Sequence, residues 1–253
     1  MNKTFVRPLT FGRMGNFLFQ AACAMAYAWR HRLEFSLPNT TNDAFGNPIY
    51  LQHLCQPEFN DNLPHVVVTE GKFTYQTLPF KEEWRHKNII LDGYWQTEKY
   101  FKEYRDRIIT AFGYEWKPAP QLVSVHVRRG DYLTIKKNGK FKHPPVPKEW
   151  LETAMALFPG YGFRFFSDDI GWCEQEFGSR NDCTFSKDKP IERDLVHMSW
   201  CAHQICSAST FSWWGAWLNQ NPNKRVIMPK HWFSPGWGRL DTSDIVPPEW
   251  ERI

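Results

Sequence analysis

The sequence predicts an α/β fold in two halves, each built around a mostly parallel sheet. Short runs rich in β-branched and aromatic residues alternate with segments of helical periodicity along the chain. The length of 253 residues exceeds the roughly 100–150 residues of one compact domain. Lys117-Pro118-Ala119-Pro120 interrupts the pattern near the middle. We therefore expect an N-terminal domain over 1–118 and a C-terminal domain over 119–253.

The first half begins with a short strand at 4–9, followed by a helix over 17–32. Leu18, Ala21, Met25 and Trp29 recur at helical spacing and give that helix a face to bury. The other elements expected in this half are strands at 33–37, 66–69 and 89–93 and a helix over 97–112.

The second half repeats the alternation more regularly. We expect strands at 121–127, 163–166, 183–185, 204–206 and 225–228. The helices expected between them cover 147–158, 170–177, 190–200 and 210–219. The Pro- and Trp-rich end, 229–253, is expected to be irregular.

Composition excludes several classes of protein. Lys plus Arg exceed Asp plus Glu by 31 − 27 = 4, which is too small an excess to indicate a nucleic-acid-binding protein. The 13 Trp, 9 Tyr and 20 Phe are a heavy aromatic load. Such a load serves either a dense core or walls that stack on sugars and bases.

The chain is expected to be cytoplasmic, either free or peripheral at a membrane. No apolar run approaches the roughly 18–20 residues of a spanning helix, and no apolar segment follows Lys3 and Arg7 as in a secretory signal. The cysteines show no short paired spacing, so buried reduced thiols are favoured over disulfides. They are Cys23, Cys55, Cys173, Cys183, Cys201 and Cys206.

Polar residues end the first strand of the second half. In doubly wound sheets, ligands bind beyond the carboxyl ends of the strands. His126 and Arg128 share one face of that strand, and Gly130 permits a sharp exit. A guanidinium at such a place suits a diphosphate, or it forms a structural pair with Asp131. For Arg129 we favour the structural pair.

Carboxylates end the next strand, at Asp168 and Asp169. They are suited to accept hydrogen bonds from ribose hydroxyls or a guanine edge, or to bind a metal. The alternative is that they cap the helix starting near Ile170. Two adjacent carboxylates without a spacer are a weak metal signal, so we expect no metal site.

Small hydroxyl residues precede the helix at 210–219. Ser209, Thr210 and Ser212, with the free N–H groups of a helix start, are typical of an anion site, although helix capping alone also explains them. Asp194 lies early in another helix, where the helix dipole favours an acid in any case.

The first half has one comparable element, Gly12-Arg13-Met14-Gly15-Asn16, whose glycines permit close approach of a ligand to the backbone. Four histidines show no metal-ligand spacing and are expected at the surface. They are His65, His86, His143 and His231.

Several long segments resemble the motifs of glycosyltransferase family 11, the α-1,2-fucosyltransferases that use GDP-β-L-fucose. The segments are HVRRGDY (126–132), FFSDD (165–169), DLVHMSWC (194–201), STFSWWGAWLN (209–219), GYWQTEKYF (93–101) and GRMGNFLFQAA (12–22). They occur in the family's order and spacing over most of the chain. GRMGN also resembles the N-terminal motif of protein O-fucosyltransferases. Arg13-Met14 and Phe17 depart from the family's usual Gly-Leu-Gly-Asn-Gln pattern, and the short chain implies reduced acceptor loops.

The resemblance implies a GT-B-like fold of two Rossmann-like domains with a cleft between them, acceptor side first and GDP-sugar side second. It implies inverting, metal-independent transfer of L-fucose to a hydroxyl of an acceptor glycan, expected to be the 2-OH of a terminal galactose. No cofactor, nucleic acid or transmembrane segment is implied; the ligands are GDP-fucose and an oligosaccharide.

The resemblance also assigns roles to residues. Arg128 would bind the diphosphate as the leaving group departs, with Asn16 near the reacting centre. Apart from the resemblance, the mechanism needs a general base for the acceptor proton, and Asp131 is our candidate. The donor-binding residues that the resemblance implies are His126, Asp194, Thr210, Phe211 and Ser212. From their places at a strand end or beside a helix start, we add Asp168, Ser209 and Arg13 to the expected donor-binding residues. The alternatives are a transferase for another nucleotide sugar, a glycan-binding module, or a GDP-binding protein without activity.

Overall fold

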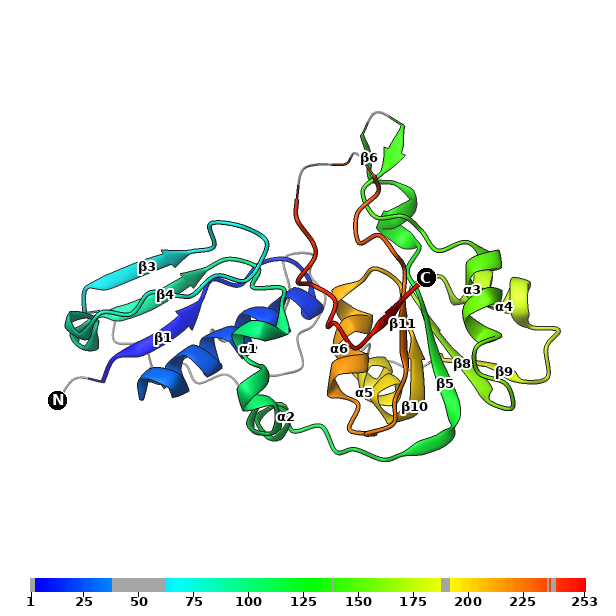
Figure 1. Ribbon diagram of the computed structural model, residues 1–253, viewed down its shortest axis with the longest axis horizontal. Coiled ribbons are helices and arrows are strands. Elements are labelled where there is room, and N and C mark those ends of the chain that lie inside the picture. Colours follow the sequence, from blue (N-terminus) through cyan, green and yellow to red (C-terminus); the bar gives the residue numbers. More distant parts are fainter. Residues whose placement is uncertain (1–2, 38–61, 138, 188–191, 236, 238–239) are drawn as a thin grey trace. The chain divides into compact units, whose positions relative to one another are not determined.

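The computed structural model describes residues 3–37, 62–137, 139–187, 192–235, 237 and 240–253. The chain folds into two compact units (Figure 1). The first comprises Met1–Tyr114 with Leu240–Pro247, and the second comprises Glu115–Arg239 with Pro248–Ile253. Each is an α/β unit around a parallel sheet.

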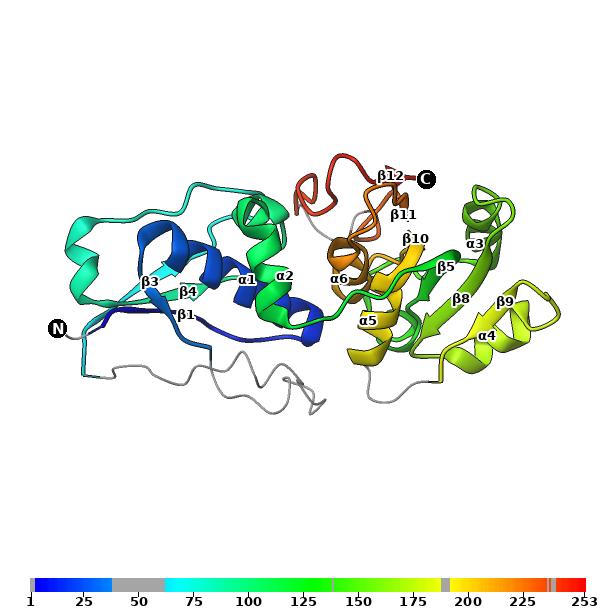
Figure 2. The same cartoon turned by 90° about the horizontal axis from the view of Figure 1, so that it is seen from below.

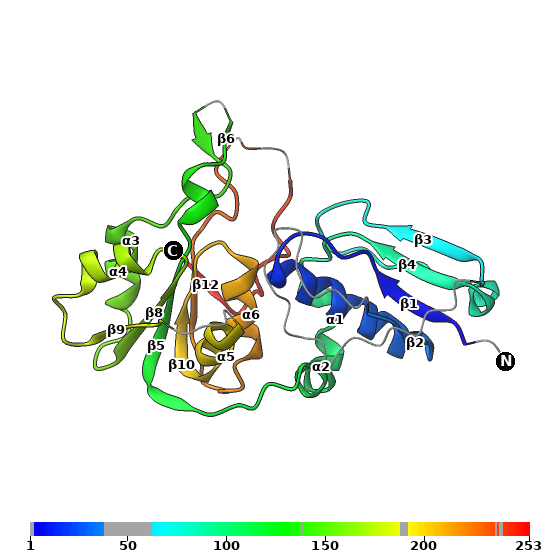
Figure 3. The same cartoon turned by 180° about the vertical axis from the view of Figure 1, so that it is seen from behind.

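The first unit holds a four-stranded sheet in the order β2-β1-β4-β3. Its strands are β1 (Phe5–Pro8), β2 (Glu34–Phe35), β3 (His65–Thr69) and β4 (Asn88–Asp92). Helix α1 (Met14–His31) packs against β1 and β2, and Figure 3 shows it lying along the sheet. It begins three residues before the predicted start, so Asn16 is helical.

The predicted helix over 97–112 is wrong in its first half. Two 3₁₀ turns, Glu98–Tyr100 and Lys102–Tyr104, precede a shorter helix α2 (Arg105–Phe112). Phe101, between the turns, has φ −145° and is fully buried. This φ lies outside the α-helical range, so the backbone breaks at Phe101 while its side chain stays in the core.

The second unit is built on a six-stranded sheet in the order β12-β11-β10-β5-β8-β9. Its strands are β5 (Ala119–Val127), β8 (Gly162–Ser167), β9 (Cys183–Phe185), β10 (Cys201–Ile205), β11 (Val226–Met228) and β12 (Glu251–Arg252). Helices α3 (Lys148–Met155) and α4 (Ile170–Phe177) cover one face, and α5 (Glu192–Trp200) and α6 (Thr210–Leu218) cover the other (Figures 1 and 2).

Three expectations for this half are corrected. Strand β10 begins directly after α5, three residues earlier than predicted, because Cys201-Ala202-His203 carries no β-branched residue to mark it. The irregular end contains β12, and a hairpin of β6 (Lys136–Lys137) and β7 (Lys140–Phe141) follows β5. Two-residue strands are too short for periodicity to show.

Much of the aromatic load lies in cores. Trp213, Trp214 and Trp217 of α6 are buried against one another, with Trp213 and Trp217 stacked at 6.1 Å. Four cysteines with free thiols are buried and Cys183 is half-buried, while Cys55 lies outside the described residues. Burial raises the pKa of the four buried thiols. In the described part of the chain, no helix is both long and apolar enough to cross a membrane.

Candidate active site at the strand ends of the second unit

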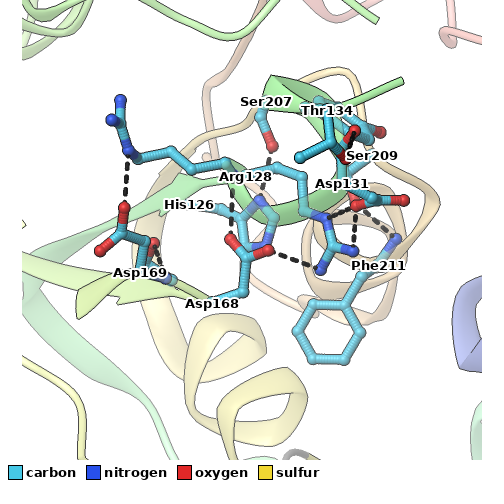
Figure 4. Close-up of polar contacts among 12 residues, drawn as sticks. His126, Arg128, Asp131, Thr134, Asp168, Asp169, Ser207, Ser209 and Phe211 are labelled. Carbon is cyan, nitrogen blue, oxygen red and sulfur yellow. Dashed lines mark hydrogen bonds and ion pairs between the residues drawn. The ribbon is translucent and has the colours of Figure 1, made fainter. Parts of the chain in front are cut away.

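The polar residues singled out in the second half meet at one edge of its sheet. Strands β10, β5 and β8 are neighbours and run parallel, so their carboxyl ends lie together. Figure 4 shows side chains from the ends of β5 and β8 beside the turn that starts α6. This edge is where doubly wound sheets bind ligands.

Arg128, just beyond β5, lies between two carboxylates. Its Nε and Nη2 donate to Oδ1 of Asp131 at 3.1 and 2.5 Å, and its Nη1 lies 3.2 Å from Oδ2 of Asp168 (Figure 4). A guanidinium has five N–H groups. Among the described contacts, three are engaged by carboxylates, which leaves one N–H on each Nη. The pair between Arg128 and Asp131, which the sequence analysis gave as an alternative, is therefore present, and two N–H groups of Arg128 remain to donate to a ligand.

Asp168 also fixes the backbone at the end of β5. Its Oδ1 accepts the backbone N–H of Arg129 at 2.9 Å. A Cβ at Gly130 would lie 2.3 Å from Asp168 Oδ2, so only glycine at this position permits the approach. Asp168 thus joins the ends of β5 and β8 while it contacts Arg128.

Asp169 and Arg129 both have structural contacts: Asp169 is a helix cap, as the capping interpretation predicted, whereas Arg129 pairs with Asp169 and not with the expected Asp131. Asp169 caps α4, accepting the backbone N–H of Trp172 at 3.3 Å. Its Oδ2 also accepts from Nε of Arg129 at 2.9 Å, and the Arg129 guanidinium lies 4.1 Å from the Trp172 ring.

His126 is a buried neutral imidazole. Its Nδ1 lies 2.6 Å from the Ser207 hydroxyl, and its ring is 5.8 Å from that of Phe211. Burial lowers the pKa of His126 to about 4, opposed by the charge of Asp168. At neutral pH this ring therefore supplies hydrogen bonds and surface rather than charge.

The start of α6 lies on the same edge and is held together by its own hydrogen bonds. Ser209 is its N-cap, accepting the backbone N–H of Phe211 at 3.3 Å. The Ser212 hydroxyl is buried and donates to the carbonyls of Ser207 and Ser209, both at 3.2 Å, so it holds the turn together. Thr210 is half-buried at the first helical position.

Sequence reasoning missed Tyr132 and placed His143 wrongly at the surface. The Tyr132 hydroxyl donates to the carbonyl of Ala208 at 2.6 Å, and its ring lies 5.7 Å from the Arg128 guanidinium. His143 is half-buried and stacks on Tyr132 at 4.5 Å, while its Nδ1 lies 3.0 Å from the Trp232 carbonyl. Burial lowers the pKa of His143 to about 4. No local pattern signals these partners, which are far apart in sequence.

The remaining predicted residues lie elsewhere. Asp194, early in α5, accepts from the Ser186 hydroxyl at 2.6 Å. Asn16 and Arg13 belong to the first unit, where Arg13 is the residue before α1 and Asn16 Oδ1 accepts from Gln96 Nε2 at 2.8 Å. Gln96, buried after β4, is a partner that the sequence did not indicate.

The residues that the structure describes contain no group of three or more His, Cys, Asp or Glu side chains placed to hold a metal ion.

Comparison with known proteins extends the sequence pattern. An alpha-1,2-colitosyltransferase of Escherichia coli is 31% identical over 179 residues, 64% of this chain and 61% of that protein. Galactoside alpha-(1,2)-fucosyltransferase 2 of Bos taurus is 28% identical over 136 residues, 46% of this chain and 39% of that protein. The matches therefore span less than two thirds of the length of either relative.

A solved structure resembles the fold over nearly the whole chain. The E. coli heptosyltransferase WaaC with ADP superposes with a TM-score of 0.53 at 9% identity, covering 98% of this chain and 92% of that one. This likeness concerns the fold alone, and it agrees with the expected GT-B-like fold. The sequence profile of Glycosyl transferase family 11 matches residues 75–253, which include all of the strand-end residues described above. The chain belongs to glycosyl transferase family 11.

Proposed function

We propose that the protein transfers L-fucose from GDP-β-L-fucose to a hydroxyl of an acceptor glycan, the 2-OH of a terminal galactose, with inversion at the anomeric carbon. Family membership supports glycosyl transfer. Two relatives named for different sugars, colitose and fucose, share the α-1,2 linkage in their names. A donor carrying colitose is accordingly the second candidate.

The observation that carries the proposal is Arg128 with its two remaining N–H groups beside the start of α6. Breaking the bond between sugar and nucleotide leaves negative charge on the departing phosphate. A guanidinium held by Asp131 and Asp168 is already oriented, so it stabilises that charge without reorganising during the reaction. Helix-start N–H groups and the Thr210 hydroxyl add donors on the same edge.

Other site residues support the same role. His126, Phe211 and Ser209 form the wall of the nucleotide pocket, and Asp194 accepts from the guanine edge. Asp131 was the candidate general base, but its contacts with Arg128 favour an orienting role instead. Asn16, held by Gln96, and Arg13 are proposed to act near the reacting carbon.

Transfer is proposed to need no metal and no cofactor, because Arg128 and the helix start supply the positive charge. Treatment with EDTA is expected to leave the transfer rate unchanged. Loss of activity that Mg²⁺ or Mn²⁺ restores would contradict this part of the proposal.

Neighbouring arginines provide the decisive test. Arg128→Ala is expected to lower kcat about 10²–10³-fold, as loss of one stabilising donor to a developing anion does. Arg129→Ala is the matched control, since its side chain pairs with Asp169 while its backbone N–H still reaches Asp168. It should retain activity within a few-fold. Equal activity of the two variants would remove Arg128 from the mechanism.

The substrates are identified by incubating the protein with GDP-fucose, other nucleotide sugars and a panel of galactose-terminated oligosaccharides, and measuring product masses. Product with GDP-fucose supports the proposal. Product only with another donor favours the second candidate, and GDP binding without product would indicate a regulatory protein.

A further inference from the structure

The first unit carries a second set of strand-end residues that the proposed donor site does not use. Strands β1, β4 and β3 are parallel neighbours, so the segments that follow them lie at one edge (Figure 3). Phe11 follows β1, Glu70 follows β3 directly, and Tyr94 follows β4. This is the ligand-binding edge of the first sheet, by the same rule that placed the site in the second.

Buried polar side chains hold these segments in place. The Gln20 amide, fully buried in α1, donates to the Phe11 carbonyl at 3.2 Å and accepts its N–H at 3.3 Å. The Glu70 carboxylate accepts the N–H groups of Tyr94 at 2.7 Å and of Trp95 at 3.1 Å. The segments that follow β1 and β4 are therefore fixed before any ligand arrives.

The backbone after β4 adopts a strained conformation at Trp95, beside the contact with Glu70. Trp95 has φ +55°, a left-handed conformation that costs a residue with a side chain about 1 kcal/mol. A Cβ at Gly93 would lie 2.4 Å from the Glu70 Cβ, so glycine is needed for the carboxylate to come this close. The strain turns Trp95 into the core while Tyr94 stays 39% exposed.

Three aromatic rings meet at this edge, which we call the Tyr94 platform: Phe11, Phe73 and Tyr94. The Phe11 and Tyr94 rings meet edge to face at 4.7 Å, and Phe73 lies 6.4 Å from Tyr94. Tyr94 is thus held on two sides and presents ring surface to solvent. An exposed aromatic ring with a fixed orientation is a stacking surface.

We infer that the Tyr94 platform binds a pyranose ring of the acceptor glycan, which stacks on Tyr94 while its hydroxyls donate to Glu70. A carboxylate has about four lone-pair positions, and the described contacts use two at Glu70. A pyranose has an apolar face of C–H groups, which suits the Tyr94 ring, and hydroxyl donors, which suit the Glu70 carboxylate. Burial raises the pKa of Glu70, and the negative charge of Asp92, at the end of β4, raises it further. Two carboxylates that interact in this way disfavour a phosphate, which separates this site from a nucleotide site.

This inference rests on the proposed function, because it names the site of the acceptor for that reaction. The test uses two readouts: binding of lactose to the full chain without nucleotide, by saturation-transfer NMR, and KM for acceptor and donor in the transfer assay. Tyr94→Ala should weaken lactose binding and raise the acceptor KM about tenfold, with GDP affinity unchanged. Tyr94→Phe keeps the ring and should stay within twofold.

A matched control and a second variant keep the test sharp. Tyr104 packs on Trp29 near the last turn of α1, so Tyr104→Ala should leave both readouts unchanged. Glu70→Gln removes one acceptor oxygen and should raise the acceptor KM while the donor KM holds.

The two proposals fail in different ways. Lactose binding that depends on Tyr94, without transfer of any sugar, would support the platform and refute the proposed function. Transfer whose acceptor KM is the same in Tyr94→Ala and wild type would refute the platform. Equal losses of acceptor and GDP affinity in Tyr94→Ala, with native circular dichroism, would also refute it.

Discussion

Replacing Gly130 with alanine should displace Asp168 and weaken the second unit. The added Cβ would lie 2.3 Å from Oδ2 of Asp168, far inside van der Waals contact. The carboxylate is not free to turn away, because its Oδ1 accepts the Arg129 backbone N–H at 2.9 Å and its Oδ2 contacts Arg128 at 3.2 Å.

The size of the loss in stability follows from the hydrogen bond that Asp168 must break. Rotation of Asp168 breaks one hydrogen bond to a charged acceptor, which contributes about 1.5–3 kcal/mol. We therefore expect Gly130→Ala to lower the free energy of unfolding by about 2 kcal/mol. For a chain of this size that corresponds to a decrease in Tm of about 4–8 °C. Transfer should slow as well, since Arg128 loses one of its two carboxylates.

The assay is the Tm of wild type, Gly130→Ala, Asp168→Ala and the double variant, compared as a double-mutant cycle. In an Asp168→Ala background, Gly130→Ala should cost almost nothing further, because the clashing oxygen is gone. Gly171→Ala is the matched control: a Cβ there meets nothing within 4 Å. The reasoning is refuted if Gly130→Ala is as stable as wild type, or if it costs as much without Asp168 as with it.

Two further predictions concern the pH dependence of stability and the division of labour between adjacent carboxylates. Because burial lowers the pKa of His143 from 6.5 to about 4, the unfolded chain takes up a proton at this site first as pH falls. His143 therefore leaves the free energy of unfolding unchanged above pH 6.5 and lowers it as the pH falls toward 4, by about 2 kcal/mol at pH 5. Urea denaturation between pH 7 and pH 5 should show a smaller decrease in the free energy of unfolding for His143→Gln than for wild type. Asp169→Ala removes the α4 cap and the Arg129 pair, and should cost about 1 kcal/mol while the transfer rate stays within twofold. A large loss of activity in that variant would place Asp169 in the reaction.

The sequence predicted which polar residues of the second unit follow strands or begin helices, because those signals are local. Arg128, Asp168 and Ser209 each follow a strand or begin a helix, and parallel strands bring their ends together without further information. The Arg128 and Asp131 pair was available as an alternative because the two residues are three apart.

The contacts that the sequence did not predict join residues that are far apart in the chain. Tyr132 reaches the Ala208 carbonyl across 76 positions, and Gln96 reaches Asn16 across 80. Neither contact leaves a periodic signal. The helix expected from 97 was wrong for a related reason: α and 3₁₀ turns both place residues three apart on nearly the same side, so the periodicity does not show the break at Phe101.

The return of residues 240–247 to the first unit bears on how the protein is made. Asp244 pairs with Lys99 and accepts the backbone N–H of Tyr75 at 2.8 Å, while Ile245 and Val246 are buried. A ribosome delivers these residues well over a hundred positions after the rest of that unit. The early part of that unit therefore keeps an apolar surface uncovered until residues 240–247 have been synthesised, and exposed apolar surface of this kind favours aggregation.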